Sequence, residues 1–196
     1  MIELKPKSIT LLVAHPDDEI IFGFGVLPYA KKIICCSNDK HNIRKPEWNN
    51  RYIAIKKVCE ILGVELINLD YNSNFWMLDD TEMFGFEETV KALIENESLI
   101  FTHNAWGEYM HRDHILLHDL AIEAKKEIIT SDIMISSDYT KFVAKNKPVI
   151  TDGLICKNNI SIYNRCKRIY RIYNGWTWGD EPFKTAIYYI EKCKQI

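Results

Sequence analysis

The chain has 196 residues, of which 47% are hydrophobic, so it is long enough to bury a full core and is most simply one domain over residues 1–196. Its 25 Lys and Arg residues nearly balance 27 Asp and Glu residues, which gives no overall charge bias toward nucleic acid or an anionic membrane. The N-terminus lacks the apolar stretch of a signal peptide, and no run approaches the roughly 18 apolar residues of a membrane span, so we expect a cytoplasmic protein.

Apolar runs alternate with helical patterns along the first half of the chain. We expect strands at residues 9–14, 32–37 and 64–69, and helices at residues 18–29 and 48–62. A polar loop is expected at 38–47. Gly23 and Gly25 are expected to let the first helix pack closely onto the sheet.

The second half continues this alternation. Residues 70–85 show no clear period and are interpreted as a long loop that could line a site. Helices are expected at 86–96 and 111–128, with strands at 99–102 and 132–136. Strands that alternate with helices imply right-handed crossovers, so the predicted fold is α/β and Rossmann-like, with a mainly parallel sheet covered by helices on both faces.

The last third and the cysteines carry less information. A strand is expected at 149–156, with helices at 158–172 and 181–193. None of the six cysteines is spaced as the C-x-x-C pairs of zinc or redox motifs, so they are interpreted as inert buried thiols.

Chemically active residue types concentrate after the first predicted strand. Residues 15–19 read His-Pro-Asp-Asp-Glu at a strand-to-helix turn, where the exposed N–H groups of a helix start favour anions. Such a turn can direct His15 and Asp18 to one point, for example a metal ion. The alternative is that the carboxylates only favour the helix start.

A second polar stretch, residues 102–114, follows the fourth predicted strand. Loops at the carboxyl ends of parallel strands meet in one crevice, so the two stretches can converge. His111, Asp113 and His114 then become available as ligands. Three protein ligands and one position left for water describe a catalytic zinc site. Because two histidines and a carboxylate also bind non-haem iron, Zn²⁺ is the first choice, and Fe²⁺ or another divalent metal stays open.

These two stretches, in this order, resemble the signatures of the PIG-L/LmbE-like metal-dependent N-deacetylases. Residues 14–19 read Ala-His-Pro-Asp-Asp-Glu, which reproduces the first signature residue for residue. Residues 111–114 read His-Arg-Asp-His, where the family has His-Pro-Asp-His, and Gly-Glu-Tyr at 107–109 is also similar. The resemblance covers roughly residues 8–128 and implies an LmbE-like fold that removes acetyl groups from N-acetylglucosamine-type substrates.

The resemblance also implies roles at matching positions. The implied zinc ligands are His15, Asp18 and His114. Asp17 would be the general base, which takes a proton from water that zinc has made more acidic. His111 would stabilise the oxyanion, unless it is only a surface histidine, and Asp113 can hold His111 charged and oriented.

Four further residues are predicted to contact substrate, each with a structural alternative. Arg51 matches a family arginine and could contact substrate or acetate, or be a charge on a helix surface. His103 and Glu108 could bind sugar hydroxyls or form hydrogen bonds within their loop. Trp106 could stack on a sugar ring or pack in the interior, and the same holds for Trp176 and Trp178.

We therefore predict a metal-dependent amide hydrolase that removes an acetyl group from a small N-acetylated sugar or sugar conjugate. One alternative is a hydrolase of a non-sugar N-acyl compound. Another is a metal-binding or protein-binding module without turnover, which the departures Arg112 and Ala54 leave open. No signal decides for or against a homo-oligomer.

Overall fold

A computed structural model describes residues 4–38, 49–133, 153–154, 160–176, 178 and 186–191. Over these residues seven strands form one sheet in the order β3-β2-β1-β4-β5-β7-β6. The parallel strands are β1 (Ile9–Val13), β2 (Ala30–Ser37), β3 (Glu65–Tyr71), β4 (Leu99–Phe101) and β5 (Glu127–Ser131). Strand β7 (Tyr188–Glu191) pairs antiparallel with β5, and β6 (Gly153–Leu154) pairs antiparallel with β7.

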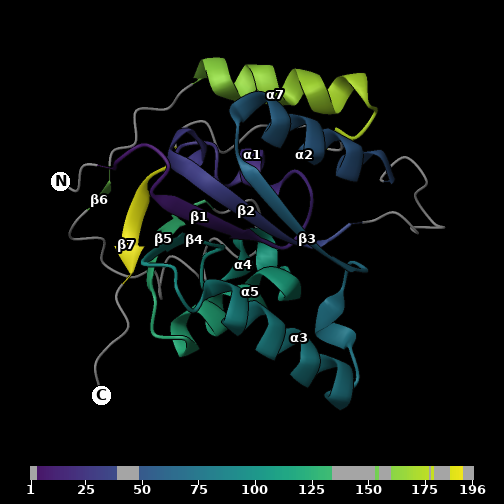
Figure 1. Cartoon of the computed structure of the whole chain (residues 1–196), viewed down its shortest axis with the longest axis vertical. Helices are drawn as coiled ribbons and strands as arrows, with labels where there is room; N and C mark the ends of the chain where they lie inside the picture. Colours follow the sequence, from purple (N-terminus) through teal and green to yellow (C-terminus); the bar gives the residue numbers. More distant parts are fainter. Residues whose placement is uncertain are drawn as a thin grey trace.

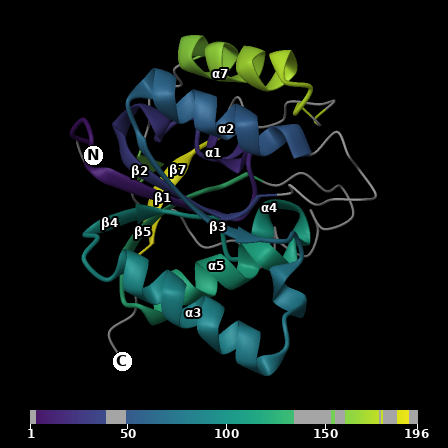
Figure 2. The same ribbon diagram turned by 45° about the vertical axis from the view of Figure 1, so that its right-hand side comes forward.

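Helices cover both faces of this sheet (Figures 1 and 2). One face carries α1 (Asp18–Ile21), α2 (Asn49–Leu62) and α7 (Ile160–Ile172). The other carries α3 (Asp80–Ile94) and α5 (Arg112–Glu123), with the short α4 (Gly107–Met110) before α5. The predicted Rossmann-like, mainly parallel α/β fold is confirmed. No helix in the described ranges is both long and apolar enough to span a bilayer.

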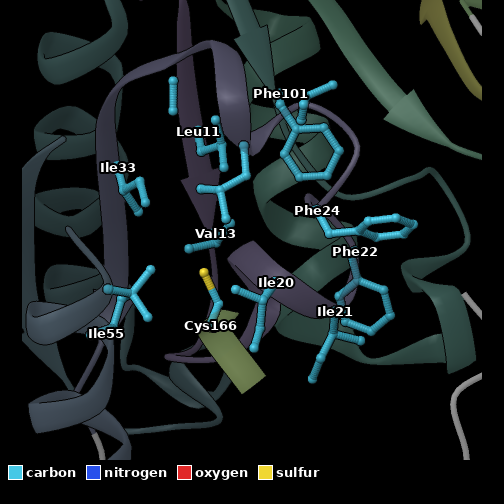
Figure 3. Packing of buried hydrophobic residues seen from close by; sticks show 14 of the residues in the cluster. Leu11, Val13, Ile20, Ile21, Phe22, Phe24, Ile33, Ile55, Phe101 and Cys166 are labelled. Atoms are coloured by element: carbon cyan, nitrogen blue, oxygen red, sulfur yellow. The ribbon is translucent and has the colours of Figure 1, made fainter. Parts of the chain in front are cut away.

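Strand β1 lies at the centre of two hydrophobic layers. Leu11 and Val13 belong to the core under α1, α2 and α7, whereas Leu12 and Ala14 belong to the core under α3 and α5. Figure 3 shows Leu11 and Val13 among side chains of the first layer, including Cys166 of α7. Because β1 is buried on both faces, its sequence is apolar apart from Thr10 and shows no polar alternation.

The two early glycines permit close packing, as predicted. A Cβ at Gly23 would lie 3.1 Å from a ring atom of Phe101 and 3.3 Å from Leu11, both on the sheet. A Cβ at Gly25 would lie 2.3 Å from the ring of Tyr188. The Tyr188 hydroxyl also donates to the carbonyl of Phe22. The chain between α1 and β2 is therefore pressed against β4 and β7.

Three expected element boundaries were wrong. Helix α3 begins at Asp80 rather than near 86, because Asp79 caps it by accepting from the backbone N–H groups of Thr81 and Glu82. A 3₁₀ turn, η3 (Phe75–Met77), also lies in the expected loop. Helix α5 ends at Glu123, Lys125 adopts φ 55°, and the fifth strand is Glu127–Ser131 rather than 132–136.

The expected helix at 181–193 is wrong where the chain is described. Tyr188–Glu191 is a strand that pairs with β5, and Tyr188 and Tyr189 are both buried. Sheet pairing and aromatic burial override the local helical pattern.

A short helix, α1, followed by a 3₁₀ turn, η1 (Leu27–Tyr29), replaces the expected helix 18–29. The expected loop at 38–47 lies outside the described residues apart from Asn38.

Four of the six cysteines are described, and all four are buried free thiols: Cys35, Cys36, Cys59 and Cys166. Burial raises the pKa of the Cys166 thiol to about 12 and that of Cys36 well above its usual range. This agrees with their interpretation as inert packing residues.

At the end of the sheet where β1 begins, Glu97 links β1 and β2. Its carboxylate accepts from the Thr10 hydroxyl and from the ammonium groups of Lys31 and Lys32, each at 2.6 Å. Burial opposes the charged form, but these donors outweigh burial and lower the pKa of Glu97 from 4.5 to about 2. A depressed pKa means that the charged carboxylate stabilises the fold above pH 4.5 and that this contribution is lost as pH falls toward 2.

We predict that Glu97→Gln lowers the free energy of unfolding by about 1.5–3 kcal/mol at pH 7, the usual range for a hydrogen bond to a charged group. The difference from wild type should shrink steadily below pH 4.5. Urea unfolding at several pH values measures it, with the exposed Glu95→Gln as the control. An equal loss at pH 7 and near the folded pKa would contradict the assigned role of the charge.

Candidate active site

The turn after β1 is held in an uncommon backbone conformation. Asp17 adopts φ 106° and ψ −21°, a region that residues other than glycine rarely occupy. Its carbonyl accepts from the N–H groups of Ile20 and Ile21, which starts α1, while the His15 N–H donates to Asp18 Oδ2 at 2.8 Å. Non-glycine residues in such regions concentrate at functional sites. The turn brings His15, Asp17 and Asp18 to the carboxyl edge of the sheet.

The second polar stretch reaches the same edge through α4 and α5. Met110 adopts φ 66° and His111 is extended, which separates Gly107–Met110 from the helix that follows. His111 caps α5, since its Nδ1 accepts from the backbone N–H of Asp113 at 3.3 Å. Asp113 and His114 then lie in the first turn, both fully buried.

Three of the side chains brought together are the predicted ligands. His15 Nδ1 lies 3.4 Å from Asp18 Oδ2, His114 Nε2 lies 3.5 Å from the same oxygen, and the two ring nitrogens are 3.3 Å apart. A tetrahedral zinc with bonds of about 2.0–2.2 Å places its ligand atoms roughly 3.3–3.6 Å from one another. The triangle formed by these atoms therefore has the size of one face of a zinc coordination tetrahedron.

The outer nitrogens of both imidazoles face carboxylates. His15 Nε2 lies 3.0 Å from Asp113 Oδ2, and His114 Nδ1 lies 2.8 Å from Glu108 Oε2. Burial opposes ionisation of Glu108, but the neighbouring imidazoles of His103 and His114 lower its pKa to about 2. An ionised carboxylate behind a histidine fixes the ring and leaves the inner nitrogen as a metal ligand. The residues present fit a divalent metal.

Two other groups of potential ligands overlap with this one. Ligand atoms of His15, His111 and His114, and of Asp18, His103 and His114, also lie within 4.8 Å of one another. In the second group, however, His103 Nε2 accepts from the Ala14 N–H at 3.1 Å, and its Nδ1 faces Glu108. Both nitrogens of His103 are therefore engaged within the protein.

A cavity of about 370 Å³ opens beside the triangle. The described residues that line it are His15, Asp17, Asp18, Arg51, Ser73, Asn74, Tyr109, His111 and Trp178. His103 and Glu108 are not among them and are fully buried, which favours their alternative as hydrogen-bonding residues of the loop. Trp106 is also absent from this wall, and its indole N–H donates to the carbonyl of Ile133.

Arg51 is a site residue rather than a charge on a helix surface. Only 6% of it is exposed, its Nη2 lies 2.6 Å from Asp17 Oδ1, and its Nε donates to the Pro16 carbonyl at 2.7 Å. One oxygen of the Asp17 carboxylate is therefore held in a buried salt bridge with Arg51. Arg51 ties α2 to the turn and fixes one oxygen of Asp17.

Asp113 plays a different part from the one expected. Its Oδ2 lies 3.9 Å from His111 Nδ1 but 3.0 Å from His15 Nε2, so it supports His15 rather than holding His111 charged. Burial, together with the imidazoles of His114 and His15, lowers the pKa of His111 to about 3. Asp113 is therefore placed to support His15, and the surroundings of His111 oppose its charged form.

Sequence reasoning did not assign roles to the segment that carries Ser73 and Asn74. Asp113 holds this segment by accepting from the backbone N–H groups of Asn74 and Trp76, at 2.8 and 3.0 Å. Arg112, which departs from the family pattern, stacks its guanidinium 4.2 Å from the centre of the Trp76 ring. In the sequence, the only indication that this loop lines a site is its lack of periodicity. For Tyr109, the only indication is the Gly-Glu-Tyr triplet at 107–109.

Comparison with known proteins identifies the family of the chain. The model of the PIG-L family, described as GlcNAc-PI de-N-acetylase, matches residues 10–125. The chain belongs to the PIG-L family. Uncharacterized protein L374 of Acanthamoeba polyphaga mimivirus is 26% identical over 127 residues, which are 53% of this chain and 52% of that protein. The alignment thus spans about half the length of this curated relative.

Two solved structures share the fold of this PIG-L chain. N,N'-diacetylchitobiose deacetylase from Pyrococcus horikoshii, complexed with its inhibitor MPG, has a TM-score of 0.60 at 13% identity, covering 91% of this chain and 73% of the other. The zinc-inhibited form of teicoplanin deacetylase Orf2 has a TM-score of 0.64 at 9% identity, covering 96% and 99%. At these identities the likeness extends to the fold alone.

We predict that His15→Ala and His114→Ala each lower the amount of zinc bound per chain, because each removes one corner of the ligand triangle. Elemental analysis after dialysis against zinc measures the stoichiometry. His118→Ala is the matched control, since His118 lies on α5 but pairs with Asp119 and Glu191 outside the site. Zinc content equal to wild type in both site variants would refute the ligand set.

We further predict that Asp113→Ala weakens zinc binding by about 10–100-fold, as removal of a carboxylate behind a ligating histidine typically does. Asp119→Ala, an exposed carboxylate of the same helix, should leave the affinity unchanged. Competition with a zinc-chelating dye measures both. If Asp113→Ala bound zinc as tightly as Asp119→Ala, the carboxylate would not support His15.

Proposed function

We propose that this PIG-L protein is a metal-dependent deacetylase that hydrolyses the acetamide of an N-acetylated sugar or sugar conjugate. The observation that carries the proposal is the triangle of His15, Asp18 and His114, whose members His15 and Asp18 line one cavity together with the Asp17 carboxylate. A metal site next to a carboxylate that is not one of its ligands suits hydrolysis, because a pure binding site has no use for a base.

His15, Asp18 and His114 would hold the metal, with zinc as first choice and Fe²⁺ or another divalent ion as the alternative. A zinc ion there would supply a Lewis acid that polarises the amide carbonyl and makes water more acidic. The carboxylates of Asp113 and Glu108 keep the two imidazoles oriented for this task.

Asp17 is the proposed general base. It takes a proton from the water whose oxygen forms the new bond to the amide carbon, and that proton then goes to the nitrogen as the carbon–nitrogen bond breaks. Acetic acid and a free amine result, and the acid then loses its proton to become acetate. Arg51 holds Asp17 Oδ1 at 2.6 Å, which keeps the carboxylate in one orientation toward the cavity.

His111 and Tyr109 are the proposed donors to the oxyanion. His111 Nδ1 accepts the backbone N–H of Asp113, so the proton of its neutral ring lies on Nε2. Burial raises the pKa of the Tyr109 hydroxyl, which therefore stays protonated and can donate. Both side chains line the cavity. Fixed donors aimed at developing negative charge lower the barrier to amide hydrolysis.

The cavity wall suits a sugar. Trp178 and Tyr109 form an aromatic side with ring centres 5.8 Å apart, on which an amphipathic ring can pack. Ser73 and Asn74 supply polar groups for hydroxyls on another side. A volume of about 370 Å³ lies near the lower end of ligand sites. The two structural relatives, a diacetylchitobiose deacetylase and a teicoplanin deacetylase, support the same substrate class.

We predict that the zinc-loaded protein releases acetate from at least one member of a panel of N-acetylated sugars, nucleotide sugars and non-sugar amides. Asp17→Asn should lower the rate by about 10²–10⁴-fold, the usual contribution of a general base, with bound zinc unchanged. The exposed Asp80→Asn is the control.

The outcomes separate the hypotheses. Turnover of non-sugar amides alone would replace the sugar substrate by another N-acyl compound. Zinc binding without any turnover would favour a binding module. Full activity of Asp17→Asn would refute the mechanism, and loss of zinc in that variant would make Asp17 a ligand.

A further inference from the structure

Residues beyond the family match lie directly behind the active-site turn. Tyr170, on α7, donates its hydroxyl to Glu19 Oε1 at 2.7 Å. The other oxygen of Glu19 accepts the backbone N–H of Asp17 at 2.9 Å. Tyr170 and Glu19 are fully buried, and Asp17 is 1% exposed. A continuous chain of hydrogen bonds therefore runs from α7 to the backbone of Asp17.

These hydrogen bonds hold a residue with an uncommon backbone conformation. Asp17 holds φ 106°, and a non-glycine residue keeps such a conformation only when its surroundings determine it. The carbonyl of Asp17 is fixed by the start of α1, and its N–H is fixed by Glu19. With both backbone groups held, the direction of the Asp17 side chain into the cavity follows.

The end of α7 also packs against the partner of the Asp17 carboxylate. The Gly175 N–H donates to the Tyr170 carbonyl at 2.8 Å, which turns the chain back toward α2. A Cβ at Gly175 would lie 3.2 Å from both N and Cα of Arg51. Residues 170–175 therefore contact Glu19 through Tyr170 and pack against Arg51 through Gly175.

We propose that Tyr170, acting through Glu19, is a positioning residue for Asp17, so that α7 is part of the catalytic scaffold. The inference rests on the proposed function in so far as Asp17 is the general base. Tyr170 does not line the cavity, and its effect is confined to where the Asp17 carboxylate points.

Two readouts test this positioning role, and one of them needs no substrate. Tyr170→Phe should accelerate hydrogen exchange of the Asp17 amide, followed by NMR, by about tenfold, because Glu19 loses the donor that holds it. In acetate release the same variant should lower kcat by about tenfold, with KM and bound zinc within twofold of wild type. Tyr163→Phe is the matched control, since Tyr163 is buried on the same helix and packs against Phe24 and Trp176.

Substitutions of Glu19 keep the test decisive. Glu19→Gln retains an oxygen for the Asp17 N–H and an amide group for the Tyr170 hydroxyl, so it should stay within threefold of wild type in both readouts. Glu19→Leu removes both contacts and should match or exceed the losses of Tyr170→Phe.

Unchanged Asp17 exchange or unchanged kcat in Tyr170→Phe would overturn the inference while leaving the deacetylase proposal intact. Equal losses in Tyr163→Phe would overturn it as well, because they would show a general effect on the fold. If the wild-type protein released no acetate from any substrate, the proposed function would fail, and the exchange of the Asp17 amide would still decide whether Tyr170 positions it.

Discussion

The hydrogen bonds between buried carboxylates and imidazoles determine the rest of the site. Asp113 stands behind His15, and Glu108 stands behind His114, so the inner nitrogens of both rings point at one place together with Asp18. Ionised groups without partners would be costly in such a buried position. The network satisfies them and fixes a triangle of the size that a metal ion requires.

The carboxyl edge of the sheet explains why these residues can meet. β1 and β4 are adjacent parallel strands, so the turns that follow them open into the same crevice. Asp113 also holds the segment of Ser73 and Asn74 at this edge, because its carboxylate accepts hydrogen bonds from the backbone N–H groups of Asn74 and Trp76. One carboxylate therefore links a proposed metal ligand to the wall against which substrate would lie.

The sequence predicted the strands and turns that follow from local residue patterns. It did not predict side-chain partners that lie far apart in the sequence. Strand β1 is an apolar run because both its faces are buried, and the polar turns after β1 and β4 follow from motif and strand order. The hydrogen-bond partner of Asp113 could not be predicted from the sequence. Asp113 lies two residues from His111, but its carboxylate contacts His15 across the site. Tyr170 was equally hidden, since only the fold places α7 behind Glu19.

The ligand set is the central claim, and anomalous diffraction at the zinc edge from crystals grown with zinc tests it most directly. We expect one peak at about 2.0–2.2 Å from His15 Nδ1, Asp18 Oδ2 and His114 Nε2, with Asp17 outside the coordination shell. A peak held by His15, His111 and His114 without Asp18, or by Asp18, His103 and His114 without His15, would contradict the account, as would no peak at this edge of the sheet.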